Sequence, residues 1–159
     1  GFVYAEAVVV LCLKKLSKAK KDGDYIHAVI KGTAINSGGK THGYTVPNAT
    51  AQTKLIQTAL ERSRLKPEDI EYVETHGTAT KLGDPIEIKA LSDLFKHPLA
   101  IGSVKSNMGH SEACAGFAGL VKIILQYQNA ILYPSAHALP ANPYCGFDTN
   151  TLNVVIQKQ

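Results

Sequence analysis

Two histidines occur in similar local contexts, each in a polar loop between a predicted strand and a predicted helix. His76 lies in the segment ETHGTAT and His110 in the segment KSNMGHSE. In layered α/β folds, loops that leave the carboxyl ends of strands form ligand sites. The positive end of a helix dipole favours the neutral imidazole, and Lys105, five residues before His110, would act in the same direction at short range.

Two neutral imidazoles that converge on one carbonyl could each donate a hydrogen bond from Nε2–H to its oxygen. Such donors stabilise the negative charge of an enolate or oxyanion, which fits chemistry at a thioester. Spacing alone leaves an alternative open, in which either histidine is a loop or core residue with its ring hydrogen-bonded to its neighbours.

Alternating strands and helices must position these loops, and the pattern predicts an α/β layered fold. A start signal precedes the second helical segment, because Asp84 is predicted as the N-cap, Pro85 as the first helical residue and Glu87 as a capping-box partner. The helix after His110 is apolar nearly all round and rich in small residues, which predicts a central, buried helix. The expected strands are residues 7–13, 25–35, 70–73, 99–104 and 152–156; the expected helices are 51–64, 84–95 and 113–127; residues 18–24 and 37–47 are expected connections.

Length and composition limit the classes of protein to consider. The chain has 159 residues, 45% of them hydrophobic and 19% charged, which suits one globular core; residues 1–159 are taken as a single domain cut from a larger fold at both ends. The net charge of +4 is scattered, and the densest basic run, residues 14–21, reads as a solvated surface. We therefore expect neither nucleic acid nor a membrane as a partner. Three dispersed cysteines indicate a reducing, cytoplasmic location.

Longer segments around the two histidines resemble the two histidine motifs of the β-ketoacyl synthase (ketosynthase) family. These segments are ETHGTATKLGDPIEI and IGSVKSNMGHSEACAGFAGLVKIIL. GTAINSGGKTHGYTVPNATAQTKLI and PSAHALPANPYCGFDTNTLNVVIQ also resemble family segments, the former most like the ketosynthases of bacterial modular polyketide synthases that use a separate acyltransferase. The resemblance implies the C-terminal half of a thiolase-type α-β-α-β-α fold.

The resemblance also implies a role for each matching residue. His76 and His110 match the catalytic histidines that bind the thioester carbonyl of the malonyl extender and assist its decarboxylation. Lys105 matches the lysine that supports the second histidine. Thr78 and Thr80 match threonines that hydrogen-bond the phosphopantetheine arm, and Asn107 matches a residue that helps to hold the surroundings of the second histidine.

The implied reaction is a decarboxylative Claisen condensation of carrier-bound acyl and malonyl thioesters in polyketide or fatty acid biosynthesis. The implied partners are an acyl carrier protein, the N-terminal half of the same ketosynthase, a second copy of the full-length parent in a homodimer, and a separate acyltransferase. No cofactor or metal bound by this chain is expected, because the carrier protein supplies the phosphopantetheine arm.

Several departures from the family pattern bear on activity. The TACSSS-type elbow with the nucleophilic cysteine and the GFGGTNAH-type oxyanion loop do not occur in this sequence, so we expect this chain alone not to condense acyl groups. Cys12 in a buried strand, Cys114 in a helix and Cys145 in a loop read as inert thiols. Four further departures lie in the first nine residues: Tyr4 stands for Arg, and Ala5, Ala7 and Val9 stand for Gly; Ala79 also stands where Gly is usual.

Two alternatives remain at this stage. One keeps the fold but makes the domain a non-elongating acyl-binding ketosynthase or a degenerate copy. The other is a metal site built from His76, His110 and Glu112, which lacks the paired Cys-x-x-Cys of zinc deaminases.

Overall fold

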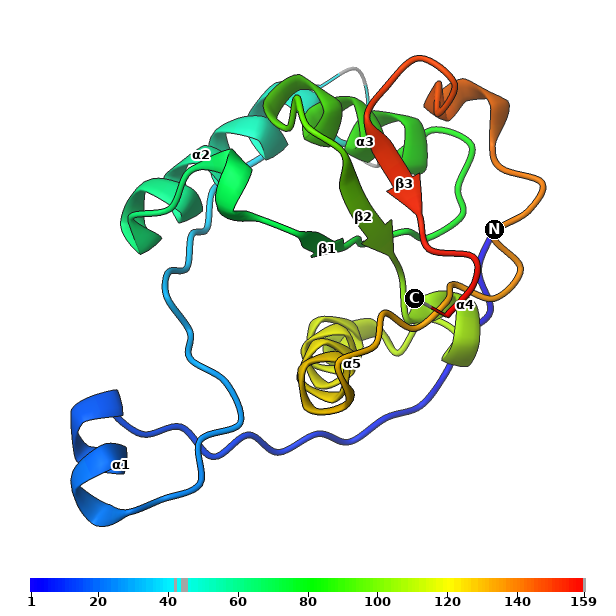
Figure 1. Cartoon of the computed structure of the whole chain (residues 1–159). Helices are drawn as coiled ribbons and strands as arrows, with labels where there is room; N and C mark the ends of the chain where they lie inside the picture. The colour runs from blue at the N-terminus through cyan, green and yellow to red at the C-terminus, as the bar shows by residue number, and fades with distance from the viewer. Residues whose placement is uncertain (42, 44–45, 159) are drawn as a thin grey trace.

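A short parallel sheet forms the centre of the molecule (Figure 1). In this computed structural model, which describes residues 1–41, 43 and 46–158, the strands are β1 (Tyr72–Glu74), β2 (Leu99–Gly102) and β3 (Leu152–Val154). They lie in the order β1-β2-β3, with Val73 opposite Ile101 and Ile101 opposite Val154. Strands are thus present in three of the predicted segments, and His76 and Lys105 follow the carboxyl ends of two neighbouring strands.

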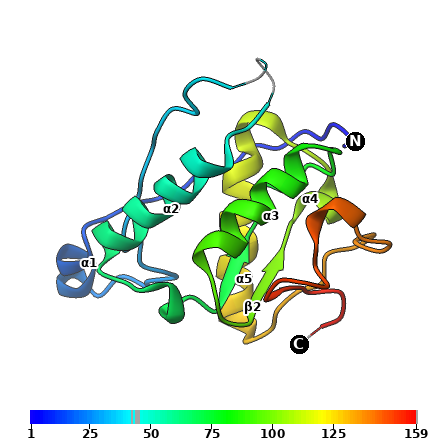
Figure 2. The ribbon, with the colours of Figure 1, turned by 90° about the horizontal axis from the view of Figure 1, so that it is seen from above.

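Helices cover both faces of this sheet (Figures 1 and 2). On one face lie α2 (Ala49–Ser63) and α3 (Gly83–Leu94), which pack against each other, and on the other lies α5 (Ala115–Asn129). This arrangement agrees with the predicted α/β layering, and all three long helices were predicted. The short elements are α1 (Leu16–Asp22), α4 (Lys105–Met108), η1 (Pro67–Asp69), η2 (Glu112–Cys114) and η3 (Pro143–Cys145). None of the described helices is long and apolar enough to span a membrane.

The hydrophobic core lies between α3 and the sheet. Leu91 on α3, Phe95 just after it and Leu99 on β2 are 2%, 1% and 0% exposed. Ile101 and Leu152 join them from β2 and β3. Burying each of these side chains contributes about 1.5–3 kcal/mol, so this face anchors the strands from which both histidine loops leave.

The other face of the sheet is different, because α5 turns polar side chains inward. Lys122 and Gln126 are buried there beside Ala118, whereas Phe117 and Leu125 are 45% and 44% exposed. The prediction of a fully buried helix is therefore wrong. The small residues do approach the sheet, but the outer face of α5 is only partly covered. An open apolar groove of about 530 Å³ lies there, lined by Val121 and Leu125 of α5 and by residues 7–9 of the chain.

Residues 5–47, called the N-terminal arm below, run beside this body, and their described positions form a single helix, α1 (Figure 1). The strands predicted at 7–13 and 25–35 are wrong in this structure, since no ladder joins those residues to any described segment. The connection predicted at 18–24 is mostly helix α1, which ends at Gly23 with φ 73°. The loop predicted at 37–47 includes positions 42, 44 and 45, which lie outside the described residues.

Two lysines of the basic run on the arm form ion pairs with nearby aspartates. Lys14 and Lys18 both bond Asp22, at 2.5 and 2.6 Å, and Lys14 also pairs with Asp24. These side chains are exposed, in agreement with a solvated surface, and water and salt screen such pairs, so they add little to stability.

Candidate functional site: two converging histidine loops

The structure brings the two predicted histidines together. His76 lies in the loop after β1, and His110 lies between α4 and η2. Their ring centroids are 5.5 Å apart, and the ring planes meet at 86°. Two imidazoles at this separation can reach the same small group on a ligand.

The backbone of the His76 loop is held by Glu87 on α3. One carboxylate oxygen of Glu87 accepts the N–H of His76 at 2.7 Å, and the other accepts the N–H of Gly77 at 3.0 Å. The predicted role of Glu87 in a capping box is therefore wrong. Its carboxylate reaches across to the histidine loop and fixes the direction in which His76 leaves the strand.

The N-cap assignment of Asp84 is wrong as well. Helix α3 begins at Gly83, after Leu82, so Asp84 already lies within the first turn. The first turn is tied instead through Thr80, whose hydroxyl accepts the N–H of Gly83 at 3.0 Å. Burial raises the pKa of Asp84, and its Oδ1 has no hydrogen-bond partner among the described residues.

The His76 ring lies in a field that favours its neutral form. Partial desolvation lowers the pKa of His76, and the ammonium of Lys105 lowers it further, whereas the carboxylate of Glu87 opposes both. The ring is still exposed in this chain. A neutral imidazole at the mouth of the site can donate or accept one hydrogen bond.

His110 is buried and held on three sides. Its backbone N–H donates to the carbonyl of Val3 at 2.7 Å, and its carbonyl accepts the N–H of Ala5 at 3.0 Å. The ring of Phe2 lies 4.9 Å from its imidazole. The backbone N–H of Glu112 donates to Nδ1 at 3.0 Å. Since Nδ1 accepts, a neutral ring carries its proton on Nε2, the tautomer that can donate to a carbonyl.

Lys105 and Asn107 lie on α4, between the two loops. Burial lowers the pKa of Lys105, and the carboxylates of Glu87 and Glu74 oppose that shift. Asn107 is exposed and its Oδ1 accepts the hydroxyl of Ser106 at 2.9 Å. No hydrogen bond within the described chain joins either side chain to His110. After desolvation, the charge of Lys105 is the next cause that lowers the pKa of His76.

A cavity of about 710 Å³ opens beside the histidine loops. Its lining includes Thr78, Lys105, Asn107 and Gly109, which flank the two histidines, but neither imidazole. The hydroxyls of Thr78 and Thr80 are 3.4 Å apart, with Thr80 just outside the lining. This entrance is wide enough for a flexible, polar chain to pass toward the histidines.

The cysteines lie in three different environments. Cys12 is exposed on the arm, so its predicted place in a buried strand is wrong. Cys114 is half-buried in η2, just before α5 and not within it. Burial raises the pKa of Cys145 to about 11, which keeps this thiol protonated at neutral pH. In the described part of the chain no hydrogen bond joins a histidine to a cysteine, so none of the three is paired with a base.

The structure does not support a zinc site built from His76, His110 and Glu112. Across residues 1–41, 43 and 46–158, no group of three or more His, Cys, Asp or Glu side chains is arranged to hold a metal ion. Glu112 contributes its backbone N–H, not its carboxylate, to His110.

The departures from glycine have unequal consequences. Ala5, Ala7 and Val9 all have negative φ, so none needs the left-handed backbone that favours glycine. Ala79 has φ 55°, beside Gly77 at φ 48°, and there the missing glycine does place a side chain in a strained region.

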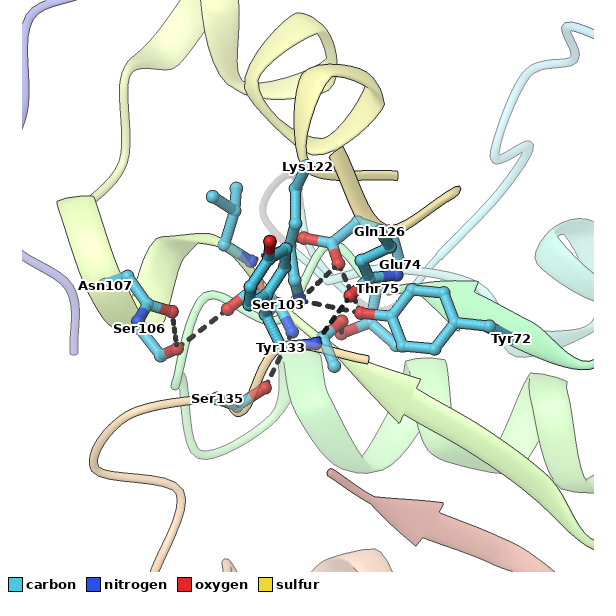
Figure 3. A network of polar contacts seen from close by, with 12 residues as sticks. Tyr72, Glu74, Thr75, Ser103, Ser106, Asn107, Lys122, Gln126, Tyr133 and Ser135 are labelled. Atoms are coloured by element: carbon cyan, nitrogen blue, oxygen red, sulfur yellow. Dashed lines mark hydrogen bonds and ion pairs between the residues drawn. The ribbon is translucent and has the colours of Figure 1, made fainter. Parts of the chain in front are cut away.

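Two carboxylates that hold the histidine loops were not predicted from the sequence. Glu87 ties the His76 loop to α3, and Glu74 ties the end of β1 to Val104 and to Lys122 of α5 (Figure 3). Lys122 was the available signal. It is the only charged residue in α5, and a charge on an inward helix face requires a partner.

Comparisons with known proteins agree on one family. The model of the family described as "Beta-ketoacyl synthase, C-terminal domain" matches residues 27–139. Polyketide synthase ThaG from Burkholderia thailandensis is 51% identical over 156 residues, which is 94% of this chain and 3% of that protein. Polyketide synthase PksL from Bacillus subtilis is 50% identical over 153 residues, 92% of this chain and 3% of that protein.

Two solved structures are similar over nearly the whole chain. The oxazolomycin ketosynthase domain from Streptomyces albus JA3453 has a TM-score of 0.87 and 44% identity, over 91% of this chain and 26% of that chain. The ketosynthase from module 6 of the bacillaene synthase from Bacillus subtilis 168 has a TM-score of 0.87 and 42% identity, over 92% and 27%. Such coverage must include part of the N-terminal arm. The chain thus spans about a quarter of these solved chains and 3% of the curated relatives above.

Proposed function

Because this chain belongs to the β-ketoacyl synthase family, we propose that it supplies the two histidines of an active site for decarboxylative Claisen condensation. The predicted family, of the bacterial polyketide synthase type, and the predicted thiolase-type fold are both confirmed. The observation that carries the proposed reaction is the pair of imidazoles 5.5 Å apart, with Nδ1 of His110 already occupied.

The chemistry follows from where the protons lie. His110 donates Nε2–H to the carbonyl oxygen of a malonyl thioester, and neutral His76 donates a second hydrogen bond. The bond between the α-carbon and the carboxylate breaks, CO₂ leaves, and the electron pair enters the enolate that both imidazoles stabilise. The enolate carbon then attacks an acyl thioester on a cysteine outside these 159 residues, and the cysteine thiolate leaves.

Other predicted residues have supporting roles in this proposal. Lys105 keeps His76 neutral through its charge. The hydroxyls of Thr78 and Thr80, close together at the cavity, suit the amides of a phosphopantetheine arm, which arrives with the substrate and its carrier protein. Asn107, at the same entrance, lines the path of that arm.

The partners follow from the family and from the short span of this chain relative to its relatives. We propose an acyl carrier protein, the N-terminal part of the same ketosynthase with the nucleophilic cysteine, a homodimer of the whole domain and a separate acyltransferase. The non-elongating alternative keeps the acyl-binding step and omits condensation; it is favoured by the changes at Tyr4 and Ala5, next to the backbone bonds of His110.

A hybrid enzyme can test whether the domain condenses acyl groups or only binds them. This chain would replace the matching part of the bacillaene module 6 ketosynthase, and malonyl-carrier decarboxylation and β-ketoacyl product would be followed by mass spectrometry. We expect product from the hybrid, and at least a 100-fold loss of decarboxylation in His76→Ala or His110→Ala, within the roughly 10²–10³ range for removing one oxyanion donor. His27→Asn, an exposed residue on the arm, is the matched control and should keep full activity.

The outcomes separate the alternatives. Acylation of the hybrid without decarboxylation, with both histidines intact, would favour the non-elongating domain and contradict condensation. The 159-residue chain alone is expected to take up no acyl group from an acyl thioester; self-acylation would disprove its dependence on an outside cysteine.

A further inference from the structure

A buried ion pair lies on the α5 face of the sheet, opposite the hydrophobic core. The side chains of Glu74 and Lys122 are 8% and 7% exposed, and Nζ of Lys122 lies 2.8 Å from Oε2 of Glu74. Desolvation makes such pairs weak sources of stability compared with apolar residues of the same size. Their presence at the centre of a small body therefore suggests a role in geometry.

The Glu74 carboxylate is fully hydrogen-bonded. Its Oε2 accepts from Lys122 and from the hydroxyl of Tyr72, the latter at 2.6 Å, while Oε1 accepts the backbone N–H of Val104. Lys122 also donates to the Tyr72 hydroxyl at 2.7 Å and lies over its ring. Burial, with the nearby carboxylate, raises the pKa of Tyr72, so the phenol stays protonated and donates to Glu74. Figure 3 shows the three side chains meeting between α5 and the sheet.

The cluster lies where both histidine loops begin. Glu74 is the last residue of β1, two positions before His76. Val104 immediately precedes Lys105, on the segment that leads to His110. One carboxylate therefore connects the start of one loop to the start of the other. Thr75 adds two bonds to the carbonyl of Gly102 on β2, from its N–H at 2.7 Å and its hydroxyl at 3.0 Å.

Two glycines leave room for this cluster. A methyl group at position 102 would lie 2.6 Å from the Tyr72 hydroxyl and 3.1 Å from Nζ of Lys122. A methyl group at position 119 would lie 3.0 Å from Cγ of Glu74. A larger residue at position 102 would press on the Tyr72 hydroxyl and the Lys122 ammonium that hold Glu74, and one at position 119 would press on Glu74 itself.

We propose that Glu74, held by Lys122 and Tyr72, is a positioning residue that sets the distance between the His76 and His110 loops. This proposal rests on the proposed function in one respect, namely that His76 and His110 are catalytic. Glu74 does not touch the reacting atoms in this scheme; it acts through Val104 and Lys105. A cluster with a purely structural role would support the fold and leave the histidines where they are.

The test compares two double variants of this 159-residue chain, Glu74→Gln/Lys122→Met and Glu74→Ala/Lys122→Met. Both remove the buried ammonium, so neither leaves an unpaired charge. Only the glutamine keeps an oxygen that can accept the N–H of Val104. Leu152→Ala, in the core on the other face, is the control for lost stability without a change at the cluster.

The measurements are the imidazole signals of His76 and His110 by ¹H–¹⁵N NMR, the nuclear Overhauser contact between the rings, and urea unfolding. We expect Glu74→Ala/Lys122→Met to lose the ring-to-ring contact. The pKa of His76 should return toward its ordinary value as Lys105 moves away. Lys105, Glu87, Asp84 and His110 are the charged or titratable groups that act on that ring. Glu74→Gln/Lys122→Met should keep both signals, as should Leu152→Ala despite its lower stability.

Unchanged histidine signals in Glu74→Ala/Lys122→Met, with reduced stability, would overturn the positioning role. Equal disturbance in the glutamine and alanine variants would overturn the part assigned to the bond with Val104. None of these measurements depends on turnover. If the hybrid enzyme failed to condense acyl groups, the NMR and unfolding data would still decide whether Glu74 positions the histidine loops.

Discussion

The body and the N-terminal arm contain similar apolar segments, but only in the body do these segments form buried, paired strands. Leu99 and Ile101 on β2 are 0% and 3% exposed, whereas Leu13 and Ile35 on the arm are 71% and 94% exposed. Strand β2 has a parallel neighbour on each side, and the arm has no ladder partner within the described residues. A pattern of β-branched and apolar residues therefore predicts a preference for strand, and the strand itself requires a partner for its N–H and C=O groups.

The two regions meet at the candidate site. At the start of the chain, where the arm begins, Val3 and Ala5 bond the backbone of His110, and the ring of Phe2 lies against its imidazole. The remainder of the arm leaves the body along the outer face of α5, where Val8 lines the open apolar groove. The site thus depends on the body for both histidine loops and on the first few residues for the orientation of one of them.

The largest expected change in the free energy of unfolding comes from a leucine-to-alanine substitution in the body, compared with the same substitution on the arm. Leu99→Ala removes a fully buried side chain next to Phe95 and should lower the free energy of unfolding by about 2–5 kcal/mol. Leu13→Ala, the same change on the arm, should alter it by less than about 0.5 kcal/mol. Urea unfolding followed by circular dichroism measures both. Similar losses in the two variants would mean that the arm is packed in solution.

The same contrast explains what could be predicted from the sequence. The histidine motifs are local, so the strand-loop-helix units around His76 and His110 could be predicted together with their fold and family. The polar links could not, because Glu74 bonds Lys122 48 residues away and Glu87 bonds a loop that precedes its own helix. The predicted strands of the arm failed for the same reason, since pairing depends on segments distant in sequence.

Substitutions in the two regions should differ in how they change the dependence of stability on pH. Desolvation and Lys105 lower the pKa of His76 in the folded chain, so the unfolded chain binds the proton more tightly. This contribution to stability is complete above the ordinary histidine pKa of about 6.5, and it is lost as pH falls below that value toward the folded pKa.

His76→Asn should therefore flatten the decline of unfolding free energy between neutral and mildly acidic pH. Leu13→Ala, on the arm, is the control for a substitution at an exposed position, and it should leave the slope as in the parent because it changes no titratable group. The effect is smaller than that of Leu99→Ala, because the His76 ring is still partly in water. Urea titrations at a series of pH values measure it, and an unchanged slope in His76→Asn would contradict the lowered pKa.

The smallest effect on stability should come from charges placed on the arm. Val10→Lys/Ile35→Lys changes two side chains that are 88% and 94% exposed, so the free energy of unfolding should move by less than about 0.5 kcal/mol. Solubility should rise, because unpaired apolar segments promote association between copies and lysines oppose it. Light scattering and urea unfolding, with Lys18→Ala/Lys21→Ala on α1 as the charge-removing control, measure both quantities. A loss of stability above about 1 kcal/mol in the lysine variant would show that the arm's apolar side chains are buried in solution. The two regions would then differ only in whether their strand-like segments pair with a neighbouring strand.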